Sequence, residues 1–67
     1  MLSIYLVTMR SGEVRTIVAR NADIARKRAS EDATEEGLRM LDNGDGNGRL
    51  LITDAPHSVR LYRKAGG

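Results

Sequence analysis

Small residues recur at helical spacing in the middle of this chain, and this pattern constrains the fold more than any other feature. Ala22, Ala25, Ala29 and Ala33 follow one another at intervals of three and four residues, so they share one face of an α-helix. Gly37, Met40 and Leu41 extend the same stripe. Because the alanine side chains are small, the helix backbone can lie close to a sheet. The spacing predicts one helix that packs across a sheet built from the rest of the chain.

The expected helix begins after Asn21, a residue type whose side chain caps a first helical turn. Its end has two interpretations. In one, the helix continues to about Asp42 and is capped by Asn43-Gly44; in the other, it ends near Glu36, and residues 38–42 begin a new strand. The continuous stripe favours the long helix slightly, although a glycine inside a helix costs about 1 kcal/mol relative to alanine.

The segments outside the helix have strand-like sequences. Residues 2–9 and 14–20 flank a turn that contains Gly12, which predicts a β-hairpin. Residues 49–54 and 58–63 are predicted as further strands, and residues 64–67 as a loose tail. We therefore expect a single α+β domain over residues 1–67, in which one helix packs on a mostly antiparallel sheet of four or five strands. This ββαββ or ββαβββ order is β-grasp-like, and would make the first and last strands central neighbours.

Composition excludes several classes of function. The chain has no cysteine and a single histidine, His57, so a structural zinc site is excluded, and no Ser/His/acid set is suggested by spacing. The paired carboxylates Glu31-Asp32 and Glu35-Glu36 fit a solvated helix face. We expect no enzymatic activity, no metal site and no cofactor. The apolar run at residues 1–9 is too short to span a bilayer and lacks a basic leader, which predicts a cytoplasmic protein.

Basic residues give the strongest indication of function. Residues 1–28 hold six basic and two acidic side chains, residues 29–57 two and seven, and residues 58–67 three and none. The run Arg26-Lys27-Arg28 lies near the helix N-terminus, where the dipole favours anions. The sheet face opposite the helix is expected to interleave two tyrosines with arginines and apolar side chains. Its expected members are Tyr5, Val7, Arg15, Ile17, Leu51, Arg60 and Tyr62.

Such a face suits surface recognition of a protein partner, direct binding of single-stranded nucleic acid, or burial in a homodimer. No membrane partner is expected. The candidate partner-binding residues are Tyr5, Arg15, Arg26, Lys27, Arg28, Arg60, Tyr62, Arg63 and Lys64.

Two short segments resemble known motifs. Residues 43–54, NGDGNGRLLITD, are similar to an EF-hand calcium loop, with oxygen-bearing side chains at the first, third and fifth positions and glycine at the sixth. Asparagine at the first position and aspartate at the twelfth depart from that pattern, so a plain glycine-rich connection is favoured. The terminal Gly66-Gly67 resembles the tail of ubiquitin-like sulfur carriers of the thiamine and molybdopterin type, which implies a C-terminal carboxylate that is adenylated and then thiolated.

A further resemblance covers residues 19–53. The run ARNADIARKRAS, followed by an acidic stretch, GLRM and DGNGRL, is similar to small phage and mobile-element proteins, some anti-CRISPR proteins among them. This resemblance implies a non-enzymatic inhibitor that occludes a charged surface on a nucleic-acid-processing complex. The expected function is thus that of a small binding module for a protein partner, with direct nucleic-acid binding and sulfur carriage as alternatives.

Overall fold

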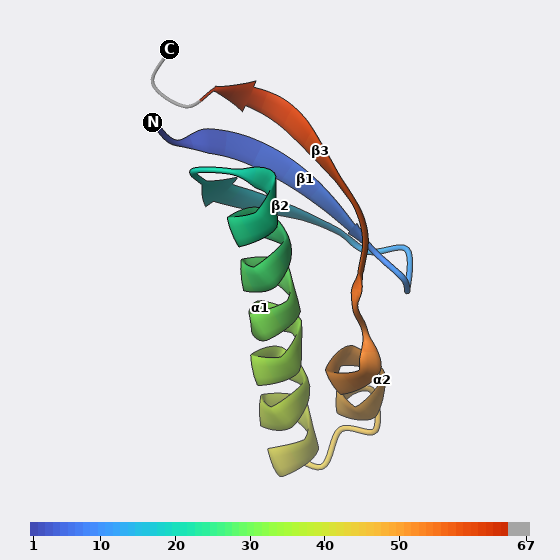
Figure 1. Cartoon of the computed structure of the whole chain (residues 1–67). Coiled ribbons are helices and arrows are strands. Elements are labelled where there is room, and N and C mark those ends of the chain that lie inside the picture. Colours follow the sequence, from blue (N-terminus) through green and yellow to red (C-terminus); the bar gives the residue numbers. More distant parts are fainter. Residues whose placement is uncertain (65–67) are drawn as a thin grey trace.

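The fold consists of three strands and two helices in the part of the chain that the computed structural model describes, residues 1–64 (Figure 1). All strand pairs are antiparallel, in the order β2-β1-β3. The α+β class and the N-terminal hairpin are confirmed, and β1 and β3 are neighbours. The expectation of four or five strands is wrong, because residues 49–54 do not form one. The elements are β1 (Ser3–Met9), β2 (Val14–Ala19), α1 (Ala22–Asp42), α2 (Gly48–Thr53) and β3 (Pro56–Lys64).

The long form of the helix is confirmed. At its start, the Asn21 side chain accepts a hydrogen bond from the Ile24 amide at 2.9 Å. At its end, Asn43 is the C-cap residue, and Gly44 takes a positive φ of 83°, a backbone conformation that glycine adopts without strain. Residues 38–42 therefore belong to α1 rather than to a strand.

The strand predicted at residues 49–54 is replaced by α2, a short helix that packs against the last turns of α1. The two backbones meet at Gly37 and Gly48. A Cβ atom on Gly37 would lie 2.6 Å from the Ile52 nitrogen and 2.7 Å from the Gly48 carbonyl oxygen. This contact explains why a glycine stands inside α1 despite its low helix propensity.

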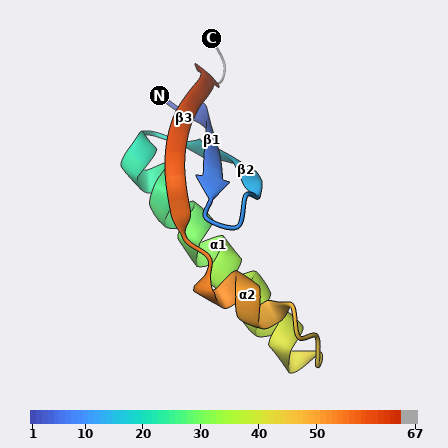
Figure 2. The same cartoon turned by 90° about the vertical axis from the view of Figure 1, so that its right-hand side faces the viewer.

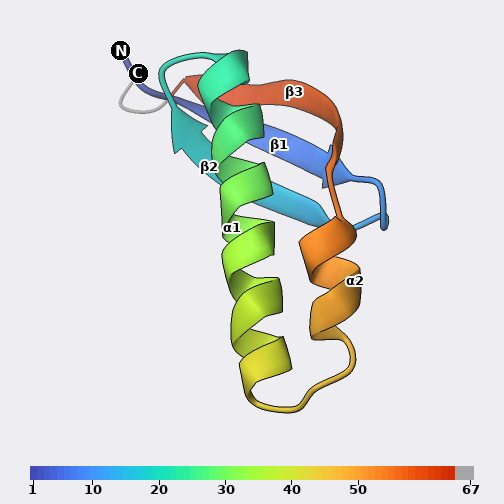
Figure 3. The same ribbon diagram turned by 60° about the horizontal axis from the view of Figure 1, so that its bottom comes forward.

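The core lies between α1 and one face of the sheet. The first half of α1 crosses the strands and covers that face, while its last turns extend past the sheet, where α2 lies alongside (Figure 3). Ala25, Ala29 and Ala33 of the alanine stripe are confirmed as the packing face, whereas Ala22, the first residue of α1, is exposed. Tyr5 and Val59 pack against the edge of the core. The buried apolar residues are Val7, Met9, Ile17, Ala19, Ala25, Ala29 and Ala33.

The C-terminal end of the described chain is part of the sheet. Lys64 pairs with Ser3 as the last residue of β3, so the predicted loose tail does not begin there. Residues 65–67, with the Gly66-Gly67 motif, lie outside the described residues. Within residues 1–64, neither helix has the length and apolar character needed to cross a membrane.

Candidate functional site

The sheet has one face covered by α1 and one face that no helix of residues 1–64 covers, and the strand register assigns the strand residues to these two faces. Residues directly opposite each other in antiparallel strands share a face. Leu6 lies opposite Thr16 on β2 and Arg60 on β3, and its neighbours Tyr5 and Val7 face α1. We call the uncovered side the open face. It consists of Ile4, Leu6, Thr8, Val14, Thr16, Val18, Ser58, Arg60 and Arg63.

The sequence-based assignment of this face is largely wrong. Tyr5, Val7, Arg15 and Ile17 lie on the covered face, where Val7 and Ile17 form part of the core. Leu51 belongs to α2. Alternation could not separate the two sides of β1, because its odd and even positions are both largely apolar. The available signal was Thr8 and Thr16, two polar side chains that pair with the open-face residues Val14 and Leu6.

Arg60 is the one member of the expected face that the register places on the open face. Tyr62 is exposed, and it has no direct partner on β1 because a register shift leaves it between the pairs Tyr5–Leu61 and Ile4–Arg63. The Arg63 guanidinium carbon lies 5.8 Å from the centroid of the Tyr62 ring, within the range of a cation–π contact. The exposed residues of β3 therefore join one aromatic ring to three basic side chains, including Lys64.

A shallow hollow of about 260 Å³ opens on the open face. Its lining residues are Leu6, Thr8, Val14, Ser58 and Arg60. Leu6 and Val14 supply apolar side chains, Thr8 and Ser58 supply hydroxyl groups, and Arg60 supplies the one charged group of this lining. Among the strand residues that the structure describes, no acidic one belongs to the open face. This surface is therefore apolar and hydroxyl-bearing at its centre and basic along β3.

The basic run at the start of α1 does not form one patch. Successive residues of a helix point about 100° apart, so Arg26, Lys27 and Arg28 project in three directions. All three are exposed. Arg28 donates from Nη1 to the Val18 carbonyl oxygen at 2.9 Å, which ties it to β2. These residues lie on α1, across the sheet from the open face.

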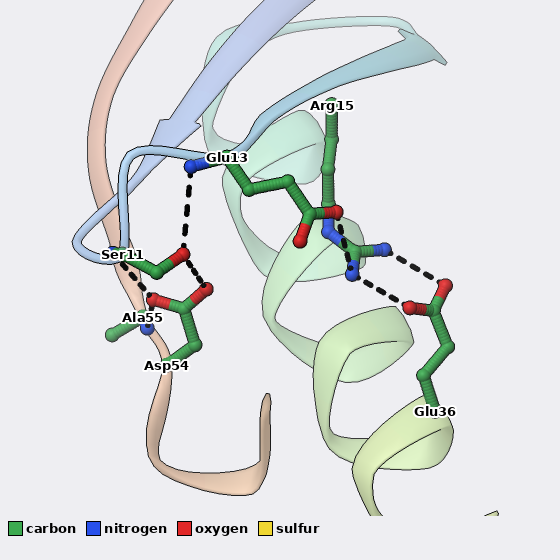
Figure 4. A network of polar contacts seen from close by, with 6 residues as sticks. All are labelled: Ser11, Glu13, Arg15, Glu36, Asp54 and Ala55. Atoms are coloured by element: carbon green, nitrogen blue, oxygen red, sulfur yellow. Dashed lines mark hydrogen bonds and ion pairs between the residues drawn. The ribbon is translucent and has the colours of Figure 1, made fainter. Parts of the chain in front are cut away.

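Arg15 is a largely buried residue that links two elements of the fold. Its side chain is 10% exposed and makes two parallel bonds to Glu36 on α1, from Nη1 to Oε1 at 3.0 Å and from Nη2 to Oε2 at 2.8 Å (Figure 4). Glu13 adds a third contact at 3.1 Å. The hydrogen bonds from Arg15 lower the pKa of Glu36, and those to Glu36 raise the pKa of Arg15. This pair links β2 to α1.

Asp54 links the hairpin turn to the start of β3. It is 8% exposed, and accepts hydrogen bonds from the Ser11 amide at 3.0 Å, the Ser11 hydroxyl at 2.7 Å and the Ala55 amide at 3.0 Å (Figure 4). Burial raises the pKa of Asp54, but the bonds from Ser11 and Ala55 outweigh it, so that its pKa is lowered overall. The Arg10 amide also donates to the Ala55 carbonyl oxygen at 2.8 Å. These contacts hold β3 beside β1.

The calcium-loop resemblance gains no metal-binding group from the structure. Within residues 1–64, no cluster of three or more His, Cys, Asp or Glu side chains is placed to hold a metal ion. Asp45 instead accepts a hydrogen bond from the Asn47 amide at 2.9 Å.

Comparison of the chain with protein-family models, with curated proteins and with solved structures found no match.

Proposed function

We propose that this protein is a non-enzymatic binding module that recognises a protein partner through the open face of its sheet. One observation carries the proposal: in residues 1–64, helix covers one side of the sheet, and the other side presents apolar residues to solvent. Val14 is 57% exposed and Val18 is 42% exposed. Antiparallel sheets usually turn polar residues to the uncovered side. Apolar residues there favour a binding surface.

The composition of the open face favours a protein as the partner. Protein interfaces combine an apolar centre with a polar rim, and arginine is enriched among the residues that contribute most to binding. The hollow has this arrangement, with Leu6 and Val14 beside Arg60. That the partner belongs to a nucleic-acid-processing complex, as the phage-protein resemblance implies, stays a prediction.

The proposal is tested by capturing partners on matched variants of the chain. Val14→Glu and Arg60→Glu place a negative charge on the open face, whereas Leu50→Glu changes a leucine of α2 that is 62% exposed. We expect the same cellular protein to bind the parent chain and Leu50→Glu, and to be lost from the two open-face variants. Equal capture by all four chains would contradict the proposal.

Direct binding of nucleic acid is the second candidate, and the composition of β3 favours it. Arg60, Arg63 and Lys64 accompany Tyr62, and β3 contains no acidic residue. Exposed bases stack on aromatic rings, and phosphates attract basic side chains. Since Tyr5 is on the covered face, Tyr62 is the only tyrosine left for stacking. A salt series on single- and double-stranded DNA tests this candidate: binding should weaken steeply as salt rises, and absent binding at low salt would remove it.

A further inference from the structure

Of the two edges of the sheet in residues 1–64, that of β3 is the longer. β3 contains nine residues and forms one edge of the sheet, with the order β2-β1-β3. Figure 2 shows it running along one side of the molecule, entered from α2. At the opposite edge, Arg28 already donates a hydrogen bond to the Val18 carbonyl oxygen of β2. Within residues 1–64, no side chain makes a comparable bond to the backbone of β3.

The register identifies the backbone groups that β3 turns outward. Residues of a central strand bond alternately to one neighbour and then to the other. The Met9 amide donates to Glu13 and the Arg10 amide to Ala55, so odd residues of β1 bond toward β2 and even residues toward β3. Val59 and Leu61 lie opposite the odd residues Val7 and Tyr5. The amide and carbonyl groups of Val59 and Leu61 therefore point away from β1, toward solvent.

The side chains along this edge differ on the two sides of the sheet. Val59 and Leu61 lie on the α1 side, where Leu61 is 50% exposed and Val59 packs against the core. Arg60 and Arg63 lie on the open face. A strand added beside β3 would therefore meet apolar side chains on the α1 side, at Val59 and Leu61, and basic side chains on the open face, at Arg60 and, beyond the register shift at Tyr62, at Arg63.

We infer that β3 accepts an extended segment of a protein partner as a fourth strand, and that this segment alternates acidic and apolar residues. Its backbone would bond to the outward amides and carbonyls of Val59 and Leu61, as in other cases of strand addition. Its acidic side chains would lie beside Arg60 and Arg63, and its apolar side chains beside Leu61. The inference rests on the proposed function and specifies the mode of binding and the chemistry of the partner.

Charge separates this occupant from a second copy of the chain. Edge strands that carry arginine and lysine resist pairing with themselves, because the same basic side chains meet across the new pair. Arg60, Arg63 and Lys64 give β3 this property, with no acidic residue to offset them. An acidic strand removes the repulsion and replaces it with attraction.

The test uses the isotope-labelled full chain and three probes. The first is a nine-residue peptide of alternating glutamate and valine, the second has lysine in place of glutamate, and the third is a short oligothymidylate. We expect the acidic peptide to bind at least about tenfold more tightly than the basic one, and to slow hydrogen exchange at the Val59 and Leu61 amides by about tenfold. Leu61→Pro removes an outward N–H without removing a bond to β1, so it should weaken the acidic peptide by about tenfold or more while the chain stays folded.

A variant that depends on charge provides a second measurement if proline disturbs the fold. Arg60→Glu together with Arg63→Glu should reverse the preference, so that the lysine peptide binds more tightly than the glutamate peptide. Four outcomes overturn the inference. The acidic peptide does not bind, or oligothymidylate protects the Val59 and Leu61 amides from hydrogen exchange instead. Alternatively, these amides are already protected in the free chain and its mass is doubled, or the chemical-shift changes caused by the peptide are confined to Leu6, Thr8 and Val14. The last outcome would leave the proposed use of the open face standing.

Discussion

The contact between Gly37 and Gly48 leads to a prediction about Gly37→Ala. In an isolated helix this change is stabilising by about 1 kcal/mol. Here the new Cβ would lie 2.6 Å from the Ile52 nitrogen and 2.7 Å from the Gly48 carbonyl oxygen. Both are backbone atoms, so α2 must move as a unit to relieve the contact.

Overpacking of this kind costs about 1–3 kcal/mol, and a clash with backbone belongs at the upper end of that range. After the gain in helix propensity, we expect Gly37→Ala to lower the free energy of unfolding by about 2 kcal/mol. In a domain of this size, such a loss lowers the melting temperature by roughly 8–16 °C.

The assay is urea and thermal unfolding followed by circular dichroism, with Gly46→Ala as the matched control. Gly46 lies in the loop between the helices, and a Cβ there meets nothing within 4 Å. The control should stay within about 0.5 kcal/mol of the parent chain. If Gly37→Ala were as stable as the parent, α2 would not pack on α1 at this position, and the explanation of the mid-helix glycine would be wrong.

The polar contacts in Figure 4 give three further predictions. Asp54→Ala leaves the Ser11 and Ala55 amides without their acceptor, and should cost about 1–3 kcal/mol in urea unfolding at neutral pH. The folded pKa values of Asp54 and Glu36 are lowered, so their contribution to stability is present above the unfolded pKa values near 4 and is lost as pH falls through the folded values. At pH values below about 4, the urea concentration at the unfolding midpoint should therefore decrease, and it should decrease less in Asp54→Ala than in the parent chain. Equal acid sensitivity of the two chains would contradict this assignment. Glu36→Ala removes an acceptor of the Arg15 guanidinium and should lower the free energy of unfolding by about 1 kcal/mol, since Glu36 is partly exposed. Adding Arg15→Met should restore most of this loss, because no unpaired charge is then left. A double variant that is no more stable than Glu36→Ala would refute this account of the pair.

Local signals were sufficient for the first 42 residues of the fold. The β-hairpin follows from two β-rich segments around Gly12, and the start of α1 follows from Asn21 and the alanine spacing. Each of these signals acts between residues close in sequence. The end of α1 at Asp42 was favoured over the alternative for the same reason, because the apolar stripe continued without a break.

Residues 48–53 could not be assigned from local signals. The sequence RLLIT is apolar and partly β-branched, and a run of this length fits a strand as well as a buried helix. Its helical state depends on α1, which offers Gly37 as a site of close approach to Gly48. Such contacts between residues distant in sequence are not visible in periodicity.

The sequence pattern assigns residues of β1 and β2 to the wrong face of the sheet for a related reason. Arginine was expected to face away from the helix, but Arg15 lies on the covered face because Glu36 reaches it from α1. Because side chains in a strand alternate between the two faces, an open-face position for Arg15 wrongly places Ile17 on the open face as well. Of the candidate contact residues, those on β3 and those at the start of α1 are exposed, whereas Tyr5 and Arg15 are partly buried on the covered face.

The central claim is that the open face, formed in part by Val18, is exposed to solvent, and that the core lies on the other side of the sheet. Adjacent residues of β2 test it directly, since Ile17 is 7% exposed and Val18 is 42% exposed. The measurement is the free energy of unfolding of Ile17→Glu and Val18→Glu. We predict that Val18→Glu stays folded and loses no more than about 1 kcal/mol, the span of strand propensities, while Ile17→Glu unfolds because it buries an unpaired carboxylate. A folded Ile17→Glu beside an unfolded Val18→Glu would contradict the account.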